Sequence, residues 1–276
     1  MTPEPAVTSG PAGSGVFAFG AVPGLIGPSR TPSDNNPAAH DGRIRCGFST
    51  RRGGVSAAPY DSLNLGGAVG DLPATVGANR AALAASAGLP ADRVVWMRQV
   101  HGTTVTRVDG PTLQGGLPDS DGTVTAVAGI GLAVLVADCV PILAGDPTAG
   151  VIAAVHAGRR GAADGIALRA IDQMTAAGAS RADIAVVLGP AICGRCYEVP
   201  AQMRDEVDAA LPGSACATDA GTPGLDLRAG LAGQLRAAGV DRVVVDPRCT
   251  RTDPDLFSHR RSAPTGRFAG LIWMPS

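Results

Sequence analysis

Residues 131–137 read Gly-Leu-Ala-Val-Leu-Val-Ala, a continuous apolar run that is followed directly by Asp138 and Cys139. A run without polar alternation predicts a strand buried on both faces. A second run of this kind, at 151–155, leads into His156. The two runs predict a central sheet that presents polar side chains where its strands end, and Pro141 indicates that the chain leaves the sheet just after Cys139.

Strand and helix patterns alternate irregularly on both sides of these two runs. Further strands are predicted over 44–49, 94–99, 104–108, 122–125, 184–188, 243–245 and 270–274. Helices are predicted over 75–87, 161–177, 201–210 and 226–238. This order favours an α/β fold that borders on α+β, with a mixed central sheet in one domain.

The N-terminal segment, residues 1–42, differs from the rest in being rich in Pro, Gly, Ser and Ala without sustained periodicity. Such a segment buries too little apolar surface to offset its ordering entropy. We expect a flexible tail with a short strand around Val16 to Phe19, followed by a catalytic domain over 43–276.

Composition limits the partners and the location of the protein. A net charge of −1 gives no positive field for polyanions, so we expect no nucleic-acid partner. No stretch reaches the ~18 uninterrupted apolar residues of a membrane span, and the N-terminus lacks the pattern of a signal peptide. We therefore expect a cytoplasmic protein with no membrane partner and with reduced cysteines, while the oligomeric state is left open.

Three potential metal ligands stand at the ends of predicted strands: His101, Cys139 and His156. Two imidazoles and one thiolate suit zinc and leave its fourth tetrahedral position open for water or substrate. The ligands lie 38 and 17 residues apart (139 − 101 and 156 − 139), unlike the close pairs of zinc fingers. The pattern predicts a catalytic metal site that the fold has to assemble.

Other acidic and cysteine residues are candidates for supporting roles near this site or for purely structural roles. Asp138 is interpreted as orienting a ligand imidazole or accepting a proton near the metal, with a turn cap as the alternative. Asp121, which precedes a predicted strand, is equally well explained as a turn cap and is left out of the catalytic set. Cys193 and Cys196 form the one close cysteine pair, interpreted as structural or incidental because no second pair exists.

Arginines beside glycines offer candidate phosphate contacts. Arg159 lies in the glycine-rich strand-to-helix junction 155–161, where backbone amides and a guanidinium can face an anion. Arg51, in the similar segment 49–54, is the main candidate for holding phosphate, and Asn64 for holding a ribose or a base edge. A solvated surface arginine is the alternative for Arg51.

Three motifs in order carry a family resemblance: Gln-Val-His-Gly at 99–102, Asp-Cys-Val-Pro-Ile at 138–142 and Val-His-Ala-Gly-Arg-Arg-Gly at 155–161. With further blocks between about 43 and 274, the chain resembles the polyphenol oxidoreductase, or laccase-domain, family, now regarded as purine nucleoside phosphorylases. The resemblance implies layered sheets flanked by helices, and a zinc enzyme that cleaves adenosine, inosine or 5′-methylthioadenosine with phosphate and deaminates adenosine. Its partners would be purine nucleosides and phosphate. His259 stands where the family usually has Tyr, and as a fourth ligand it would close the metal site.

Other functions remain open from the sequence. A copper-dependent polyphenol oxidase also uses two His and one Cys, although the additional coppers of a multicopper oxidase need more than the four His of this chain. A cysteine-type hydrolase that edits cell-wall precursors would use Cys139 as nucleophile and a His as base. A non-enzymatic protein with a structural zinc is the remaining alternative, and it would unfold on chelation.

Overall fold

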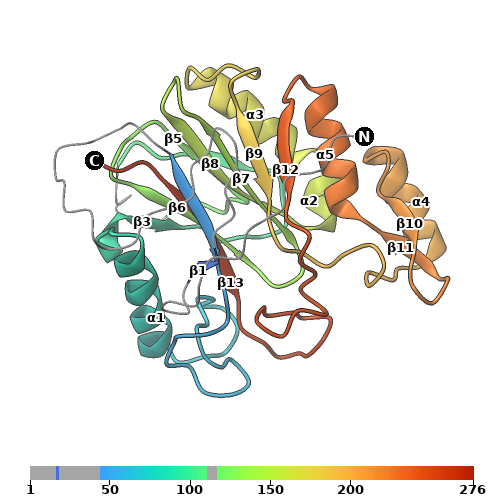
Figure 1. Ribbon diagram of the computed structural model, residues 1–276, viewed down its shortest axis with the longest axis horizontal. Coiled ribbons are helices and arrows are strands. Elements are labelled where there is room, and N and C mark those ends of the chain that lie inside the picture. Colours follow the sequence, from blue (N-terminus) through green and yellow to red (C-terminus); the bar gives the residue numbers. More distant parts are fainter. Residues whose placement is uncertain (1–16, 19–43, 111–116) are drawn as a thin grey trace, which may run out of the picture.

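The computed structural model describes residues 17–18, 44–110 and 117–276, which form two β-sheets lying face to face with helices outside them (Figure 1). This confirms the predicted mixed α/β class with layered sheets in one domain. None of the described helices is long and apolar enough to cross a membrane.

The first sheet has five strands in the order β1-β2-β13-β6-β3. β13 is antiparallel to both β2 and β6, whereas β3 is parallel to β6. β1 confirms the short strand expected near the N-terminus, and the rest of the expected tail, 1–16 and 19–42, lies outside the described residues. The strand bounds are Phe17–Ala18 (β1), Arg45–Ser49 (β2), Phe268–Trp273 (β13), Gly131–Val136 (β6) and Val94–Trp96 (β3).

The second sheet has six strands in the order β12-β9-β7-β8-β5-β4. Its strand β7 was not predicted: Pro141 was interpreted as ending the sheet, but the chain passes from β6 of the first sheet straight into β7 of the second. Pro141 is accommodated opposite His156 near the start of β7. The bounds are Arg242–Val245 (β12), Ala185–Leu188 (β9), Val140–Asp146 (β7), Val151–Ala157 (β8), Gly122–Thr125 (β5) and Val105–Arg107 (β4).

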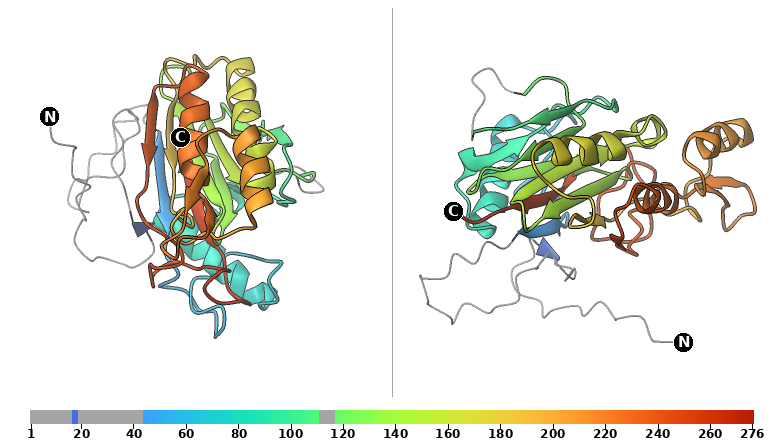
Figure 2. Two further views of the ribbon diagram at one scale, coloured as in Figure 1. Left: turned by 90° about the vertical axis from the view of Figure 1, so that its right-hand side faces the viewer. Right: turned by 90° about the horizontal axis from the view of Figure 1, so that it is seen from above.

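Helices cover the outer face of each sheet (Figure 2). α1 (Pro73–Ser86) packs on the first sheet through Leu83 and Ala84, whereas α3 (Ile166–Ala176) and α5 (Leu227–Ala237) pack on the second. The helix predicted over 161–177 is interrupted, because Gly165 adopts a left-handed φ of 84° between α2 (Arg159–Ala163) and α3. The remaining elements are η1 (Ala91–Arg93), α4 (Ala201–Ala210) and the hairpin of β10 (Ala215–Ala217) and β11 (Pro223–Leu225).

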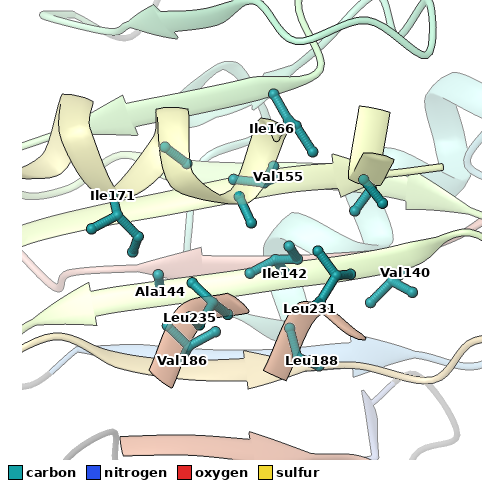
Figure 3. Close-up of a cluster of buried hydrophobic side chains, with 14 of the residues drawn as sticks. Val140, Ile142, Ala144, Val155, Ile166, Ile171, Val186, Leu188, Leu231 and Leu235 are labelled. Atoms are coloured by element: carbon teal, nitrogen blue, oxygen red, sulfur yellow. The ribbon is translucent and has the colours of Figure 1, made fainter. Parts of the chain in front are cut away.

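Two apolar layers hold these elements together. Between the sheets, side chains such as Val134 and Phe268 meet Leu143 and Ile152. Beneath the helices, the second sheet contributes Val140, Ile142, Ala144, Val155, Val186 and Leu188 to a cluster that includes Ile166, Ile171, Leu231 and Leu235 (Figure 3). Each fully buried side chain of this size contributes about 1.5–3 kcal/mol of transfer free energy. The rigid double layer fixes the positions of the strand ends that carry the candidate site.

Candidate metal centre

The three predicted ligands meet where the two sheets join. His101 follows β3 of the first sheet, Cys139 lies in the turn from β6 to β7, and His156 is in β8 of the second sheet. Their potential ligand atoms all lie within 4.8 Å of one another. Cys139 Sγ is 3.8 Å from His101 Nε2, and the two imidazole rings are 4.7 Å apart at 84°.

This donor set fits a zinc ion. Zinc bonds of about 2.3 Å to sulfur and 2.0 Å to nitrogen place tetrahedral ligand atoms roughly 3.5 Å apart. A small contraction of the observed group reaches that spacing. His156 is only 3% exposed, Cys139 is partly buried and His101 is exposed. The group therefore extends from the buried second sheet to the protein surface.

The backbone around the group is specialised for close approach. His101 and Asp138 adopt left-handed φ angles of 60° and 99°, which are uncommon for residues other than glycine. A Cβ on Gly158 would lie 2.7 Å from His101 Cδ2 and 3.3 Å from Cys139 Sγ. Glycine at this position therefore lets the start of α2 lie directly against two of the ligands.

Asp121 holds two of the three ligands in place. This fully buried carboxylate accepts a hydrogen bond from His156 Nδ1 at 2.8 Å and from the backbone amide of His101 at 2.9 Å. It also accepts from the amides of Gly102 and Val100. Burial would raise the pKa of Asp121, but these donors lower it below its usual range. The bond to Nδ1 leaves His156 Nε2 as the metal-binding nitrogen.

The charges of the group match its chemistry. Burial would raise the pKa of Cys139, but hydrogen bonds and charge from His101 and His156 lower it to about 6. Burial would lower the pKa of His156, whereas Asp121 and Cys139 raise it to about 9. The lowered pKa favours the thiolate form of Cys139, which is the form that binds metals.

The group opens into a cavity of about 750 Å³. Trp96 and Tyr197 give it aromatic walls, with the guanidinium of Arg80 4.2 Å from the Trp96 ring and that of Arg260 5.1 Å from the Tyr197 ring. Ring faces suit the stacking of a base, and guanidinium groups suit a phosphate. Among the described residues, the arginines lining the cavity are Arg80, Arg98, Arg159, Arg260 and Arg267.

Asp138, Arg159 and His259 also reach this cavity. The Asp138 carboxylate accepts hydrogen bonds from Thr250 Oγ1 and Ser258 Oγ at 2.6 Å each and from the Arg260 amide at 2.7 Å. These bonds hold the segment 250–260 beside the site. The hydrogen bond to a ligand imidazole, which was predicted for Asp138, is made by Asp121. His259 is exposed in the cavity and is not part of the three-ligand group.

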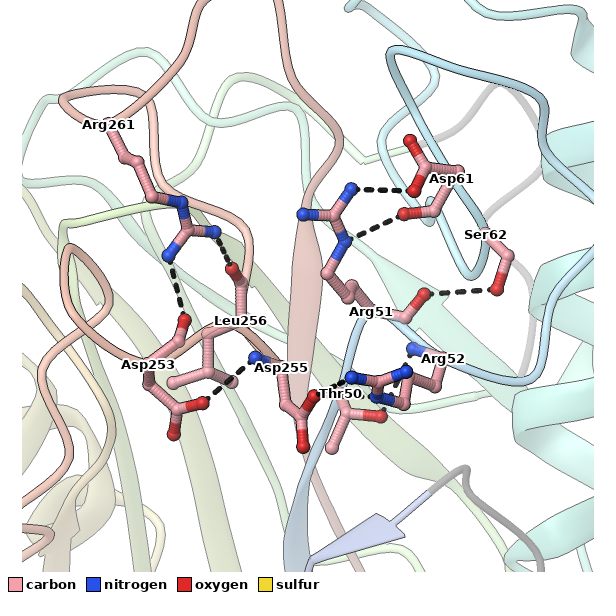
Figure 4. Close-up of polar contacts among 9 residues, drawn as sticks. All are labelled: Thr50, Arg51, Arg52, Asp61, Ser62, Asp253, Asp255, Leu256 and Arg261. Atoms are coloured by element: carbon pink, nitrogen blue, oxygen red, sulfur yellow. Dashed lines mark hydrogen bonds and ion pairs between the residues drawn. The ribbon is translucent and has the colours of Figure 1, made fainter.

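Arg51 and Asn64 lie away from the cavity lining. The Arg51 guanidinium donates to the Asp61 backbone oxygen at 2.8 Å and pairs with its carboxylate at 2.9 Å (Figure 4). Asn64 is fully buried, and its Oδ1 accepts from the amides of Gly66 and Arg267, both of which line the cavity. The structure places Asn64 behind the cavity wall, and the substrate contacts of both residues stay predictions.

Sequence reasoning missed part of the site. Asp121 could have been recognised from its position directly before a predicted strand. Cys139 was recognised from a similar position, at the other end of a predicted strand. Arg80 and Trp96 carry no such signal, because they come from α1 and β3 and converge only through packing. Gln99 was also missed: its amide pairs with both backbone atoms of Leu135, at 2.7 and 2.8 Å, and anchors the segment that carries His101.

Comparisons with known proteins agree over most of the chain. The family model described as multi-copper polyphenol oxidoreductase laccase matches residues 45–275. A purine nucleoside phosphorylase of Mycobacterium tuberculosis is 61% identical over 232 residues, 84% of this chain and 92% of that protein. One of Streptomyces coelicolor is 52% identical over 228 residues, 83% of this chain and 94% of that protein.

Solved structures show the same fold. YlmD of Geobacillus stearothermophilus has a TM-score of 0.84 at 33% identity, covering 99% of this chain and 100% of that one. Protein NMB0706 of Neisseria meningitidis has a TM-score of 0.77 at 35% identity, covering 84% of this chain and 95% of that one. The chain therefore belongs to the laccase-like polyphenol oxidoreductase family, in which similar proteins bear the name purine nucleoside phosphorylase.

Proposed function

We propose that this protein is a zinc-dependent purine nucleoside phosphorylase that acts on adenosine, inosine and 5′-methylthioadenosine and also deaminates adenosine. The names of its relatives support the phosphorylase activity. The observation that carries the proposal is the open His101–Cys139–His156 group at the edge of a cavity lined by arginines and aromatic rings. We place the protein in the cytoplasm, as its sequence led us to expect.

His101, Cys139 and His156 would hold the zinc ion, with Asp121 fixing the orientation of His156. An open zinc site supplies Lewis-acid chemistry and lowers the pKa of water toward ~7. The thiolate form of Cys139 and the hydrogen bond on His156 Nδ1 favour this donor set. Asp138 would act by holding the segment 250–260 beside the ligands, since its carboxylate is already occupied by three donors.

In phosphorolysis, a phosphate oxygen forms a bond to C1′ of the ribose while the bond from C1′ to the purine nitrogen breaks. The purine leaves with a proton, and ribose 1-phosphate is the second product. Arg159, the first residue of α2, would bind phosphate next to the ligands. Trp96 and Tyr197 would hold the purine by stacking, so that both reactants are oriented in one cavity.

Deamination replaces the C6 amino group of adenosine with oxygen from water and releases ammonia. It requires the purine ring, rather than the ribose, to face the metal ligands. Both reactions therefore need the nucleoside to bind in two orientations. The cavity, at about 750 Å³, has room for a nucleoside and a phosphate.

Product analysis tests the proposal. Purified protein of known metal content is incubated with adenosine, with and without phosphate. We expect adenine and ribose 1-phosphate only when phosphate is present, and ammonia under both conditions, with inosine as its co-product when phosphate is absent. Failure to form adenine would contradict the phosphorylase, and failure to release ammonia would contradict only the deaminase.

One contact favours a second candidate, a cysteine-type hydrolase. Cys139 Sγ lies 3.8 Å from His101 Nε2, the arrangement in which a thiolate attacks a carbonyl carbon and an imidazole carries the proton. Such an enzyme would accumulate an acyl adduct on Cys139. Mass spectrometry of the quenched reaction distinguishes the two, because a zinc ligand is expected to show no added mass.

A copper-dependent oxidase is a further candidate, because the family description names multi-copper polyphenol oxidoreductases. Within the described residues, however, the only ligand group containing histidine is His101–Cys139–His156, whereas a multicopper oxidase needs additional histidines for its other coppers. Zinc and copper contents, measured on the same protein used for product analysis, decide between the two. A non-enzymatic zinc protein would contain zinc but form no product.

A further inference from the structure

A second group of sulfur atoms lies in the described part of the chain, outside the site above. The sulfur atoms of Cys193, Cys196 and Cys249 all lie within 4.8 Å of one another. Cys193 and Cys196 are in the connection between β9 and α4, and Cys249 is in the connection that follows β12. All three thiols are free and partly or fully buried.

Backbone hydrogen bonds shape this group. The amides of Cys196 and Tyr197 donate to the Cys193 carbonyl at 2.9 and 3.0 Å, which folds the Cys-Gly-Arg-Cys segment into a tight turn. A bridge between Ala191 and Cys249 brings the two connections together. The Cys193 amide donates to Cys249 Sγ at 3.4 Å, and such a donor favours the thiolate form of the sulfur.

We propose that Cys193, Cys196 and Cys249 bind a second, structural zinc ion. Bonds of about 2.3 Å place tetrahedral thiolates roughly 3.8 Å apart, so the observed group needs only a small contraction. A close Cys-x-x-Cys pair is half of the ligand set typical of structural zinc, and Cys249 adds a third thiolate from another connection. A disulfide, by contrast, would use two of the three sulfur atoms and leave the third without a partner.

A fourth thiol lies beside the group. Cys216, in β10, is partly buried, and a Cβ on Gly194 would lie 2.6 Å from its sulfur atom. Gly194 is between the two cysteines of the tight turn, so Cys216 packs against that turn. It is the candidate for the fourth ligand of a closed tetrahedral site.

The cysteine group adjoins the segments that form one wall of the cavity. Ile192 and Tyr197, which lie on either side of the cysteine pair in the sequence, both line the cavity. The Ile192 amide donates to the Asp138 carbonyl at 3.0 Å, and Thr250, next to Cys249, donates to the Asp138 carboxylate. A metal ion here would hold one wall of the cavity in place while taking no part in the reaction.

Metal content tests the second site independently of activity. The full chain, purified from zinc-supplemented cells, should contain two zinc ions, and Cys196→Ser and Cys139→Ala should each contain one. Cys46→Ala, which removes a buried thiol of β2, should still contain two. Equal zinc contents in the wild type and Cys196→Ser, or no zinc in Cys139→Ala, would overturn the proposal.

Cobalt substitution keeps the test decisive if Cys196→Ser does not fold. Cys139→Ala removes the thiolate of the first centre, so any thiolate-to-cobalt charge-transfer band in this variant comes from the second group. We expect a strong band of several thiolates. Its absence, or an intact mass showing the loss of two hydrogens from a disulfide in anaerobically purified protein, would contradict the second site.

Discussion

His101, Cys139 and His156 meet at the junction of the two sheets, whereas Cys193, Cys196 and Cys249 meet on connections outside the sheets. The first group mixes imidazole with thiolate, is backed by the Asp121 carboxylate and opens into a cavity. The second group has only sulfur donors, and backbone amides donate hydrogen bonds to its Cys249 sulfur and its Cys193 carbonyl.

One chain can thus place reactive groups and stabilising groups at separate sites. An open mixed site keeps a coordination position for water or substrate, whereas a closed thiolate site contributes to folding. The two groups are also connected, because Asp138 adjoins Cys139 and accepts a hydrogen bond from Thr250, which adjoins Cys249. Five changes to the chain separate the two roles.

Cys139→Ala should separate the groups most clearly. Removing one ligand of the open site should lower phosphorolysis by on the order of a hundredfold or more. The melting temperature should change by only a few degrees, because the sheets and the second group are intact. Turnover assays and calorimetry on the same sample check this, and unfolding of the variant would show that the first centre is structural.

Asp121→Asn tests the carboxylate that distinguishes the first group. An amide cannot accept from all four donors with the same strength, so zinc affinity should fall by about 10–100-fold. Asp119→Asn, which only removes a more exposed ion pair with Arg98, is the matched control and should keep wild-type affinity. Competition with a chelator measures both, and equal affinities would remove Asp121 from the centre.

Arg159→Ala tests the anion site beside the first group. Loss of charge-assisted hydrogen bonds of about 1.5–3 kcal/mol should raise the KM for phosphate by about tenfold or more and leave that for nucleoside nearly unchanged. Arg51→Lys is the comparison, because the sequence favoured Arg51 whereas the structure pairs it with Asp61. A larger effect at Arg51 would restore the assignment made from the sequence.

Gly158→Ala tests the close packing around the first group. The added Cβ would meet His101 and Cys139, and overpacking of this kind costs about 1–3 kcal/mol in unfolding free energy. Gly77→Ala in α1 is the control, because nothing lies within 4 Å of its added Cβ. Denaturant titration should show destabilisation only at position 158, accompanied by weaker zinc binding.

Deleting residues 1–40 should have the smallest effect on either group. The deletion removes β1, which is paired with two residues of β2 at the edge of the first sheet. A two-residue edge strand adds little stability, so melting temperature and turnover should be nearly unchanged. A large drop in either quantity would show that the segment contributes to the folded domain.

The sequence was sufficient for much of this comparison and not for the rest. Apolar runs that end in His or Cys located the first group, because buried strands present their flanking residues at fixed places. A turn cap explained Asp121 as well as catalysis did, and the carboxylate does cap the backbone at 100–102 while also binding His156. One residue serving two purposes cannot be recognised from local pattern alone.

Long-range packing explains the other differences. Cys249 joins a cysteine pair that ends 53 residues earlier (249 − 196), and contacts such as the bridge to Ala191 and the hydrogen bond from the Cys193 amide bring them together. The Cys-x-x-Cys pair therefore looked incomplete in the sequence. Arg51 was favoured for its glycine-rich neighbours; its guanidinium pairs with Asp61, ten residues further along, and it is not among the residues that line the cavity, so its contact with phosphate stays a prediction.

The passage of the chain from β6 to β7 has a consequence for the order of folding. Cys139 lies in the connection between two sheets, and its partners come from β8 and from the segment that follows β3, so no single sheet contains a complete ligand set. Contacts between such distant segments form late, because closing the long loops between them lowers the chain entropy before the contacts can stabilise the fold. A metal ion held by all three ligands would bind tightly only after the sheets have docked, so its binding would be the last step in the maturation of the chain.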